Sequence, residues 1–240
     1  MSEADNPFAA FGPAEAVKVG KIQRITGTLL HRSWSTIPHV THHDEADITD
    51  FETRRQAWNA AHPDAKVTPL AALVKASVSA LKALPIFNSS LSEDGATLYR
   101  KAYHHIGIAV DTPNGLLVPV IRDCDVKDQA TIAAEIAAVA GKARERGLGM
   151  AEMSGGCFSI TSLGHIGGTG FTPIINAPEV AILGVTKLVE RPVRGPDGAV
   201  VWRKMLPLSL SYDHRVVNGA DAARFTRHIA EFMAGAAAGG

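Results

Sequence analysis

The chain has 240 residues, of which 46% are hydrophobic and 20% charged, and this composition is typical of one large or two small globular domains. Twenty-four Lys and Arg balance twenty-four Asp and Glu, so the basic surface of a nucleic-acid-binding protein is not expected. A long segment without a charged residue, 154–178, holds six glycines and two prolines, which argues against a membrane-spanning helix.

The first residues, Met1 to Asn6, have neither the basic start nor the apolar stretch of a signal peptide. Cys124 and Cys157 lie far apart and form no CxxC pair, a pattern that fits a reducing compartment and argues against a disulfide framework. No HExxH sequence places two imidazoles on one helix face, so we expect no metal site.

Residues 1–16 are rich in Ala, Pro and Gly and lack a periodic apolar pattern, so they are interpreted as a linker or arm. From Val17 onward, apolar residues recur every three or four positions, which predicts an amphipathic helix that Pro38 ends.

Two further helices have recognisable first residues. The sequence TDFE predicts a helix that begins at Thr49, with Glu52 completing a capping box. The next helix begins at Thr68, with Pro69 in its first turn, and ends before Pro85.

The middle of the chain changes to a strand-like pattern. Two apolar runs, 104–112 and 115–123, are joined by Asn-Gly and predict a hairpin. A helix over 128–146 follows, with Gly147 as its C-cap.

Strands dominate the remainder of the chain, and one last helix follows them. Their expected ranges are 157–162, 179–190 and 200–212, with a turn at 195–198 and the helix over 220–233. The predicted fold is therefore α/β, with two layers: a mixed β-sheet and helices on one of its sides.

One histidine has a context that suggests chemistry. His214 lies in SLSYDHRVVNGADAARF, between the end of a predicted strand and the start of a helix after Gly219. A side chain at such a junction is held rigidly yet open to ligands, and imidazole titrates near neutral pH. For a single histidine, a purely structural role is the simpler interpretation.

A glycine-rich segment, Gly164 to Gly170, matches neither common phosphate-binding pattern, so a tight loop is its simpler interpretation. Just before it, Thr161 and Ser162 end a strand, which directs one hydroxyl to each side of the sheet. No GxSxG sequence surrounds them, which argues against an α/β-hydrolase.

Three segments together resemble the catalytic domain of dihydrolipoamide acyltransferases, the core components of 2-oxoacid dehydrogenase complexes. They are HIGIAVDTPNGLLVPVIRD, FSITSLGHIGGTGFTPIINAPEVAILGV and LPLSLSYDHRVVNGADAARF. The likeness extends from Phe8 to Met233 and is strongest to the acetyltransferases of bacterial pyruvate dehydrogenase complexes. The resemblance implies the fold of chloramphenicol acetyltransferase and a catalytic domain over 17–234, followed by a flexible tail over 235–240.

The resemblance assigns catalytic roles to four residues. His214 would be the general base that removes a thiol proton, and Thr161 would donate a hydrogen bond to the tetrahedral oxyanion, with Ser162 as the alternative donor. Asn218 stands where the family commonly has Asp, and as an amide it can form a hydrogen bond near a thiolate without adding negative charge.

The resemblance also implies residues that support the site. Asp213, Arg215 and Gly219 would hold the loop of His214, and Asp213 would pair with Arg32.

Coenzyme A or acetyl-CoA and the lipoyl group would be the substrates, with no metal. The candidates for contacts to coenzyme A are Gly167, Gly168 and Thr172.

A homotrimer is implied, with the active site between subunits and lipoyl domains as partners. Other components of the complex would bind through regions absent here, because 1–16 is too short for a lipoyl domain. The final AGAAAGG has little to bury, so weak or absent assembly of trimers into a cage is expected. The expected location is the bacterial cytoplasm, or the mitochondrial matrix in a eukaryote.

Three alternatives stay open. The chain could be an inactive structural or binding subunit of the core, which the intact His214, Arg215 and Gly219 argue against. It could transfer another acyl group, succinyl or branched-chain, since threonine at position 161 is familiar from succinyltransferases. It could also acylate a small alcohol or amine.

Overall fold

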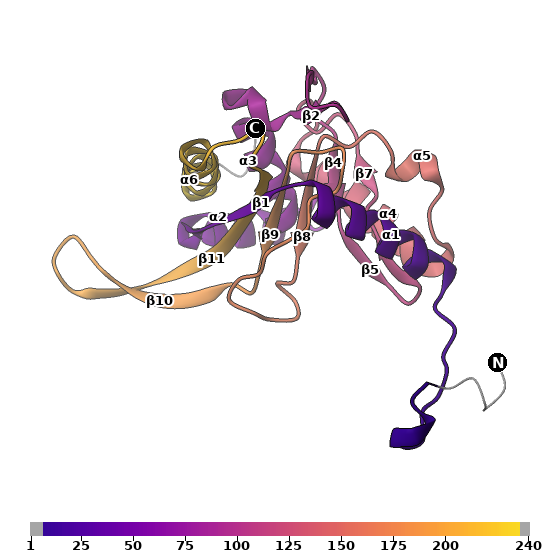
Figure 1. The fold of residues 1–240 in the computed structure, drawn as a ribbon. Coiled ribbons are helices and arrows are strands. Elements are labelled where there is room, and N and C mark those ends of the chain that lie inside the picture. Colours follow the sequence, from indigo (N-terminus) through magenta and orange to yellow (C-terminus); the bar gives the residue numbers. More distant parts are fainter. Residues whose placement is uncertain (1–6, 236–240) are drawn as a thin grey trace.

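The computed structural model describes residues 7–235 (Figure 1). Residues 7–20 are exposed along their length and lead away from the body of the protein, with a short 3-10 helix, η2, at Ala9–Phe11. Helix α1, Lys21–Thr36, begins later than the apolar pattern predicted. Val17 and Val19 are 75% and 49% exposed and precede Gly20, whose backbone is extended, so they belong to the arm.

A seven-stranded mixed sheet forms the centre of the fold, in the order β1-β11-β9-β8-β4-β7, with β10 paired to β11. Strand β8 runs parallel to β4 and β9, and the other pairs are antiparallel. The strands are β1 His39–Asp47, β4 Ile106–Ile108, β7 Val120–Ile121, β8 Phe158–Ser162, β9 Ala181–Val185, β10 Val189–Arg194 and β11 Val200–Asp213.

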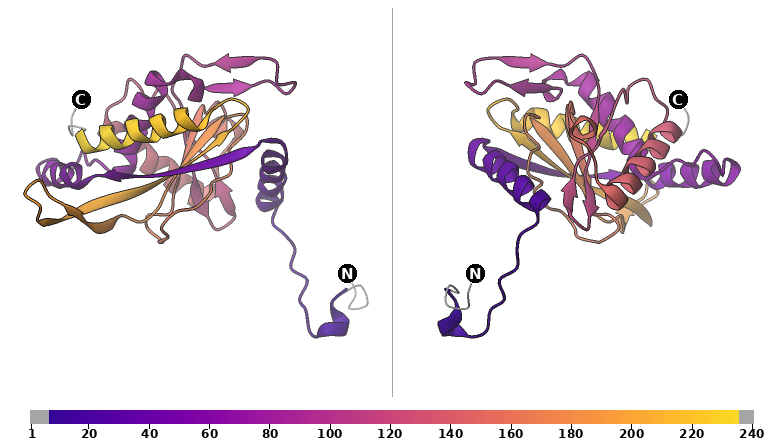
Figure 2. Two further views of the ribbon diagram at one scale, coloured as in Figure 1. Left: turned by 60° about the vertical axis from the view of Figure 1, so that its left-hand side comes forward. Right: turned by 90° about the vertical axis from the view of Figure 1, so that its right-hand side faces the viewer.

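Helices cover one face of this sheet, as predicted (Figure 2). They are α2 Thr49–Ala61, α3 Pro69–Ala83, α4 Gln129–Arg146 and α6 Gly219–Gly235. Their core includes Phe225 of α6, whose ring lies 4.1 Å from that of Phe87 and 5.5 Å from that of Phe158 on β8. This layer fixes which side chains of each strand point toward the helices.

Several local predictions are confirmed. The Thr68 hydroxyl caps α3 by accepting a hydrogen bond from the Ala71 amide at 3.1 Å. Gly147 ends α4 at a φ of 75°. The predicted hairpin forms between β5 Val110–Thr112 and β6 Gly115–Leu117, and its outer parts pair as β4 and β7.

The predicted capping box at Thr49 is wrong. Thr49 is the first residue of α2, and its hydroxyl donates to Asp47 and accepts a hydrogen bond from the Lys204 amide. The Glu52 carboxylate instead binds Arg55 at 2.6 Å. Contacts with β1 and β11 therefore outcompete the local cap, because they satisfy the same hydroxyl.

Other differences concern short elements. The run expected as one strand over 179–190 is split into β9 and β10 by residues 186–188. The sequence did not predict η3 Pro85–Phe87, α5 Met150–Met153 or the small hairpin of β2 Ser89–Leu91 and β3 Leu98–Arg100. The expectation about cage assembly rests on the AGAAAGG end, most of which lies outside the described residues.

Candidate active site

The two faces of the central sheet carry different side chains. Phe158, Ile160 and Leu183 point toward the helices and are buried in the main core. Because side chains alternate along a strand, Ser159 and Thr161 of β8 point to the opposite face. Ser209 and other hydroxyl-bearing residues of β11 and β1 share that face, which we call the free face of the sheet.

A cavity of about 1080 Å³ lies over the free face at β8 and β9. Helix α1 contributes apolar residues such as Ile22, Ile25 and Leu29 to its walls, and the end of α4 contributes the charged Lys142 and Arg146. Thr161 lines this cavity, whereas Ser162 lies on the other side of the strand, where its Oγ accepts a hydrogen bond from the Gly164 amide at 3.4 Å. The backbone therefore separates the two predicted donors.

A buried polar cluster forms part of the cavity wall, and sequence reasoning missed it. The Ser159 hydroxyl donates to Oε1 of Glu179 at 3.0 Å, and Nδ2 of Asn176 lies 3.4 Å from the same oxygen. Burial raises the pKa of Glu179 to about 7 and lowers the pKa of Lys101, whose charge acts on Glu179. The only signal in the sequence is a carboxylate placed directly before the apolar run VAILGV.

His214 lies in the turn that follows β11. Its backbone amide donates to the Pro38 carbonyl at 3.0 Å, and its side chain is exposed. The preceding Asp213 is 2% exposed and accepts hydrogen bonds from the backbone amide and the guanidinium of Arg215, the latter at 2.7 Å. This paired arrangement raises the pKa of Arg215 and fixes the turn that carries the imidazole.

The predicted pair between Asp213 and Arg32 is wrong. Arg32 lies on α1, where its guanidinium binds Glu93 at 2.6 Å, and both side chains are largely exposed. Arg215 satisfies Asp213 instead, because it lies two residues away in the same turn.

Asn218 and Gly219 lie at the start of α6, close in sequence to His214. The Asn218 carbonyl accepts hydrogen bonds from the amides of Asp221 and Ala222, both at 3.0 Å, and the Asn218 side chain is exposed. His214 and Asn218 are thus held at the two ends of one short, anchored turn.

Within one chain, His214 and Thr161 lie far apart. Thr161 is opposite Gly184 on β9, and Gly184 is opposite Ser209 on β11. His214 lies five residues beyond Ser209. At about 3.4 Å per residue and about 4.8 Å between strands, the two side chains are separated by roughly 20 Å.

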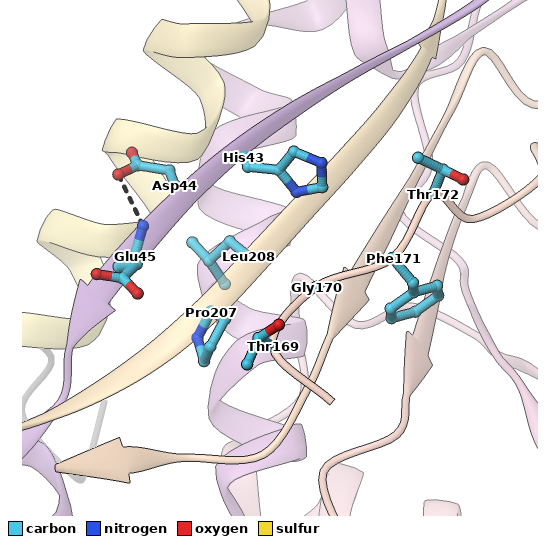
Figure 3. Close-up of a pocket in the computed structure, with 9 residues that line it drawn as sticks. All are labelled: His43, Asp44, Glu45, Thr169, Gly170, Phe171, Thr172, Pro207 and Leu208. Atoms are coloured by element: carbon cyan, nitrogen blue, oxygen red, sulfur yellow. Dashed lines mark hydrogen bonds between the residues drawn. The ribbon is translucent and has the colours of Figure 1, made fainter. Parts of the chain in front are cut away.

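The glycine-rich loop has the conformation of a tight turn, since Gly167 and Gly168 have φ values of 145° and 88°. Beyond it, Thr172 lines a second hollow of about 510 Å³, together with His43 and residues of β11 (Figure 3).

Among residues 7–235, no group of three or more His, Cys, Asp or Glu side chains is arranged to hold a metal ion. Within the same range, no helix is both long and apolar enough to cross a membrane.

Comparison with known proteins gives a consistent result. A family model of the catalytic domain of 2-oxoacid dehydrogenases acyltransferase matches residues 11–238. The acetyltransferase components of the pyruvate dehydrogenase complexes of Pseudomonas aeruginosa and Azotobacter vinelandii are each 56% identical over 95% of this chain. The chain spans only 42% and 36% of the length of these two relatives.

Solved structures agree with this result. A crystallographic and enzymatic study addressed the roles of a serine, a histidine and an asparagine in the catalytic mechanism of the Azotobacter vinelandii dihydrolipoamide acetyltransferase. Its structure matches with a TM-score of 0.92 and 53% identity, covering 96% of this chain and 95% of that one. The cubic core of the pyruvate dehydrogenase complex matches equally well, with 54% identity over 96% of this chain and 95% of that one.

Chloramphenicol acetyltransferase shares the fold alone. Its structure matches with a TM-score of 0.57 and 15% identity, covering 86% of this chain and 94% of that one. From the family match and the level of identity, the chain belongs to the 2-oxoacid dehydrogenase acyltransferases, as a catalytic domain.

Proposed function

We propose that this chain transfers an acetyl group between the dihydrolipoyl group of a lipoyl domain and coenzyme A, in the core of a pyruvate dehydrogenase complex. The observation that carries the proposal is the anchored turn with His214 and Asn218 at its ends. In the Azotobacter vinelandii acetyltransferase, the histidine and the asparagine studied for catalysis are also four positions apart.

The reaction needs a base for a thiol. An unperturbed thiol has a pKa near 8.5, about two units above that of imidazole, so His214 can take the proton as the sulfur attacks the thioester carbonyl. The tetrahedral intermediate collapses by expelling the other sulfur as a thiolate, and the protonated His214 returns the proton to it. Both thiols are substrates, and the chemistry requires no resident cofactor.

The oxyanion of that intermediate needs a hydrogen-bond donor. The Thr161 hydroxyl lies at the end of β8 on the cavity side, so it is our candidate, in preference to Ser162. Asn218 adds an amide beside the reacting sulfur, while Asp213, Arg215 and Gly219 keep the turn in place.

A separation of roughly 20 Å prevents His214 and Thr161 of one chain from acting on the same carbonyl. We therefore infer an assembly in which His214 of one copy meets Thr161 of the next, and the family resemblance implies that it is at minimum a homotrimer. Apolar residues of α1 support a covered surface, since Ile25, Leu29 and Trp34 are 53%, 60% and 59% exposed in the single chain.

The surrounding organisation is also a proposal. Residues 17–234 are assigned to the catalytic domain, 1–16 to an arm and 235–240 to a tail, of which only Gly235 lies within the described residues. Lipoyl domains are the proposed partners, and the bacterial relatives favour a cytoplasmic location.

Replacing His214 tests the base. We expect His214→Ala to lower the rate of acetyl transfer from acetyl-CoA to free dihydrolipoamide by roughly a hundred- to ten-thousand-fold, because a positioned base contributes about that much. His62→Ala, which alters an exposed histidine at the end of α2, serves as the control and should keep the native rate. Equal rates for the native chain and His214→Ala at unchanged oligomer size would contradict the mechanism. Replacing acetyl-CoA by succinyl-CoA in the same assay tests which of the two acyl groups the chain transfers.

The two hydroxyls can be separated by a matched pair of variants. Thr161→Ala should reduce kcat by about a hundred- to a thousand-fold, as the loss of one oxyanion donor does, while Thr161→Ser restores most of it. Ser162→Ala should change kcat only a few-fold, since its hydroxyl bonds to the loop. The reverse order, measured by steady-state kinetics, would make Ser162 the donor.

Glu179, in the cavity wall, makes the free energy of unfolding of the chain depend on pH. Its pKa is raised from 4.5 to about 7 by burial, so the folded state binds a proton that the unfolded state has lost. The contribution is fully present below pH 4.5 and is lost as the pH rises through 7. In urea unfolding, the stability of the native chain relative to Glu179→Gln should fall by on the order of 3 kcal/mol over this window. A pH-independent difference would show that Glu179 has an ordinary pKa.

A further inference from the structure

A row of four residues crosses the free face of the sheet. Thr161 on β8, Gly184 on β9, Ser209 on β11 and His43 on β1 lie directly opposite one another in register. Residues opposite one another on neighbouring strands point to the same face. Gly184 alone in this row has no side chain. The Cα atoms of its two neighbours, Thr161 and Ser209, are two strand spacings or about 10 Å apart, and the missing side chain leaves a gap between them.

The ring of Phe171 fills this gap. A Cβ atom added to Gly184 would lie 2.6 Å from Cζ and 2.9 Å from Cε1 of Phe171, closer than such atoms can approach. A glycine inside a strand often marks such a close approach. Beside it, a Cβ added to Gly170 would lie 3.7 Å from both Nδ1 of His43 and Oγ of Ser209. Residues 170–171 therefore pack directly against the sheet.

Two separate spaces meet at this ring. Phe171 lines both the cavity of about 1080 Å³ that contains Thr161 and the hollow of about 510 Å³ that contains His43. Charged side chains line both spaces: Lys101, Lys142 and Glu179 are among those of the first, and Asp44 and Glu45 lie at the edge of the second. Figure 3 shows the chain crossing over the strands at Gly170, with Phe171 on the side away from His43.

We propose that Phe171 is a partition residue, which keeps water of the hollow at His43 away from the thioester at Thr161. This inference rests on the proposed acetyl transfer. Water competes with the incoming thiol, because its oxygen can attack the same carbonyl, giving acetate while the thiol of coenzyme A leaves with a proton. Excluding water from a reacting thioester is a recognised task of an enclosed site. Phe171 performs it by position, without exchanging a proton or a bond.

The test measures hydrolysis of acetyl-CoA, as free thiol released without an acceptor, against acetyl transfer to dihydrolipoamide. Phe171→Ala removes the ring, and Gly184→Ala adds a methyl group where the ring lies. Each should raise the ratio of hydrolysis to transfer by about tenfold or more, since both open the partition. Leu116→Ala shortens another apolar residue of the same cavity and should leave the ratio unchanged.

The double variant distinguishes a shared cause from two separate ones. With Phe171 already Ala, the methyl group of Gly184→Ala has no ring to displace, so the double variant should match Phe171→Ala. Transfer that persists with an unchanged ratio in both single variants would overturn the inference and leave the proposed function intact. Multiplying effects in the double variant would also overturn it. No transfer by the native chain would refute the proposed function, and this inference with it.

Discussion

The two-sided character of the central sheet is the constraint on which the rest of the structure depends. Strand alternation directs Ile160, Leu183 and Leu210 into the helices, and this packing leaves no choice of register. The hydroxyls of Ser159 and Thr161 are consequently fixed on the free face, against the cavity. A slip of one residue in β8 would bury Thr161 and expose apolar side chains, so the packing of the core and the position of the candidate donor are one property.

The same register keeps the two halves of the proposed chemistry apart. His214 continues β11 beyond the sheet and is fixed there by the buried Asp213, whereas Thr161 ends β8 two strands away. A rigidly held general base is effective only if the reacting atoms of the substrate are brought within its reach. The proposed symmetric assembly would supply what a single chain lacks, since each copy would offer His214 to one neighbour and Thr161 to the other.

Features set by short stretches of sequence could be predicted, and features set by distant contacts could not. The cap at Thr68 and the stop at Gly147 depend on a few adjacent residues. The hydroxyl of Thr49 was misassigned because Lys204 reaches it across the sheet. The resemblance pointed to Thr161 and His214 as candidates, but Glu179 and Phe171 matter through packing around them. The only sequence signal for Glu179 is its place before an apolar run, and no local pattern marks Phe171.

Complementation between two inactive variants tests the central claim most directly. His214→Ala and Thr161→Ala chains would be mixed in equal amounts, unfolded together and refolded, and acetyl transfer compared with each variant alone. If every site takes His214 and Thr161 from different copies, about a quarter of the sites in randomly mixed trimers hold both residues, and about a quarter of the native activity returns. Activity no higher than that of the separate variants, in assemblies shown to contain both chains, would contradict the shared site.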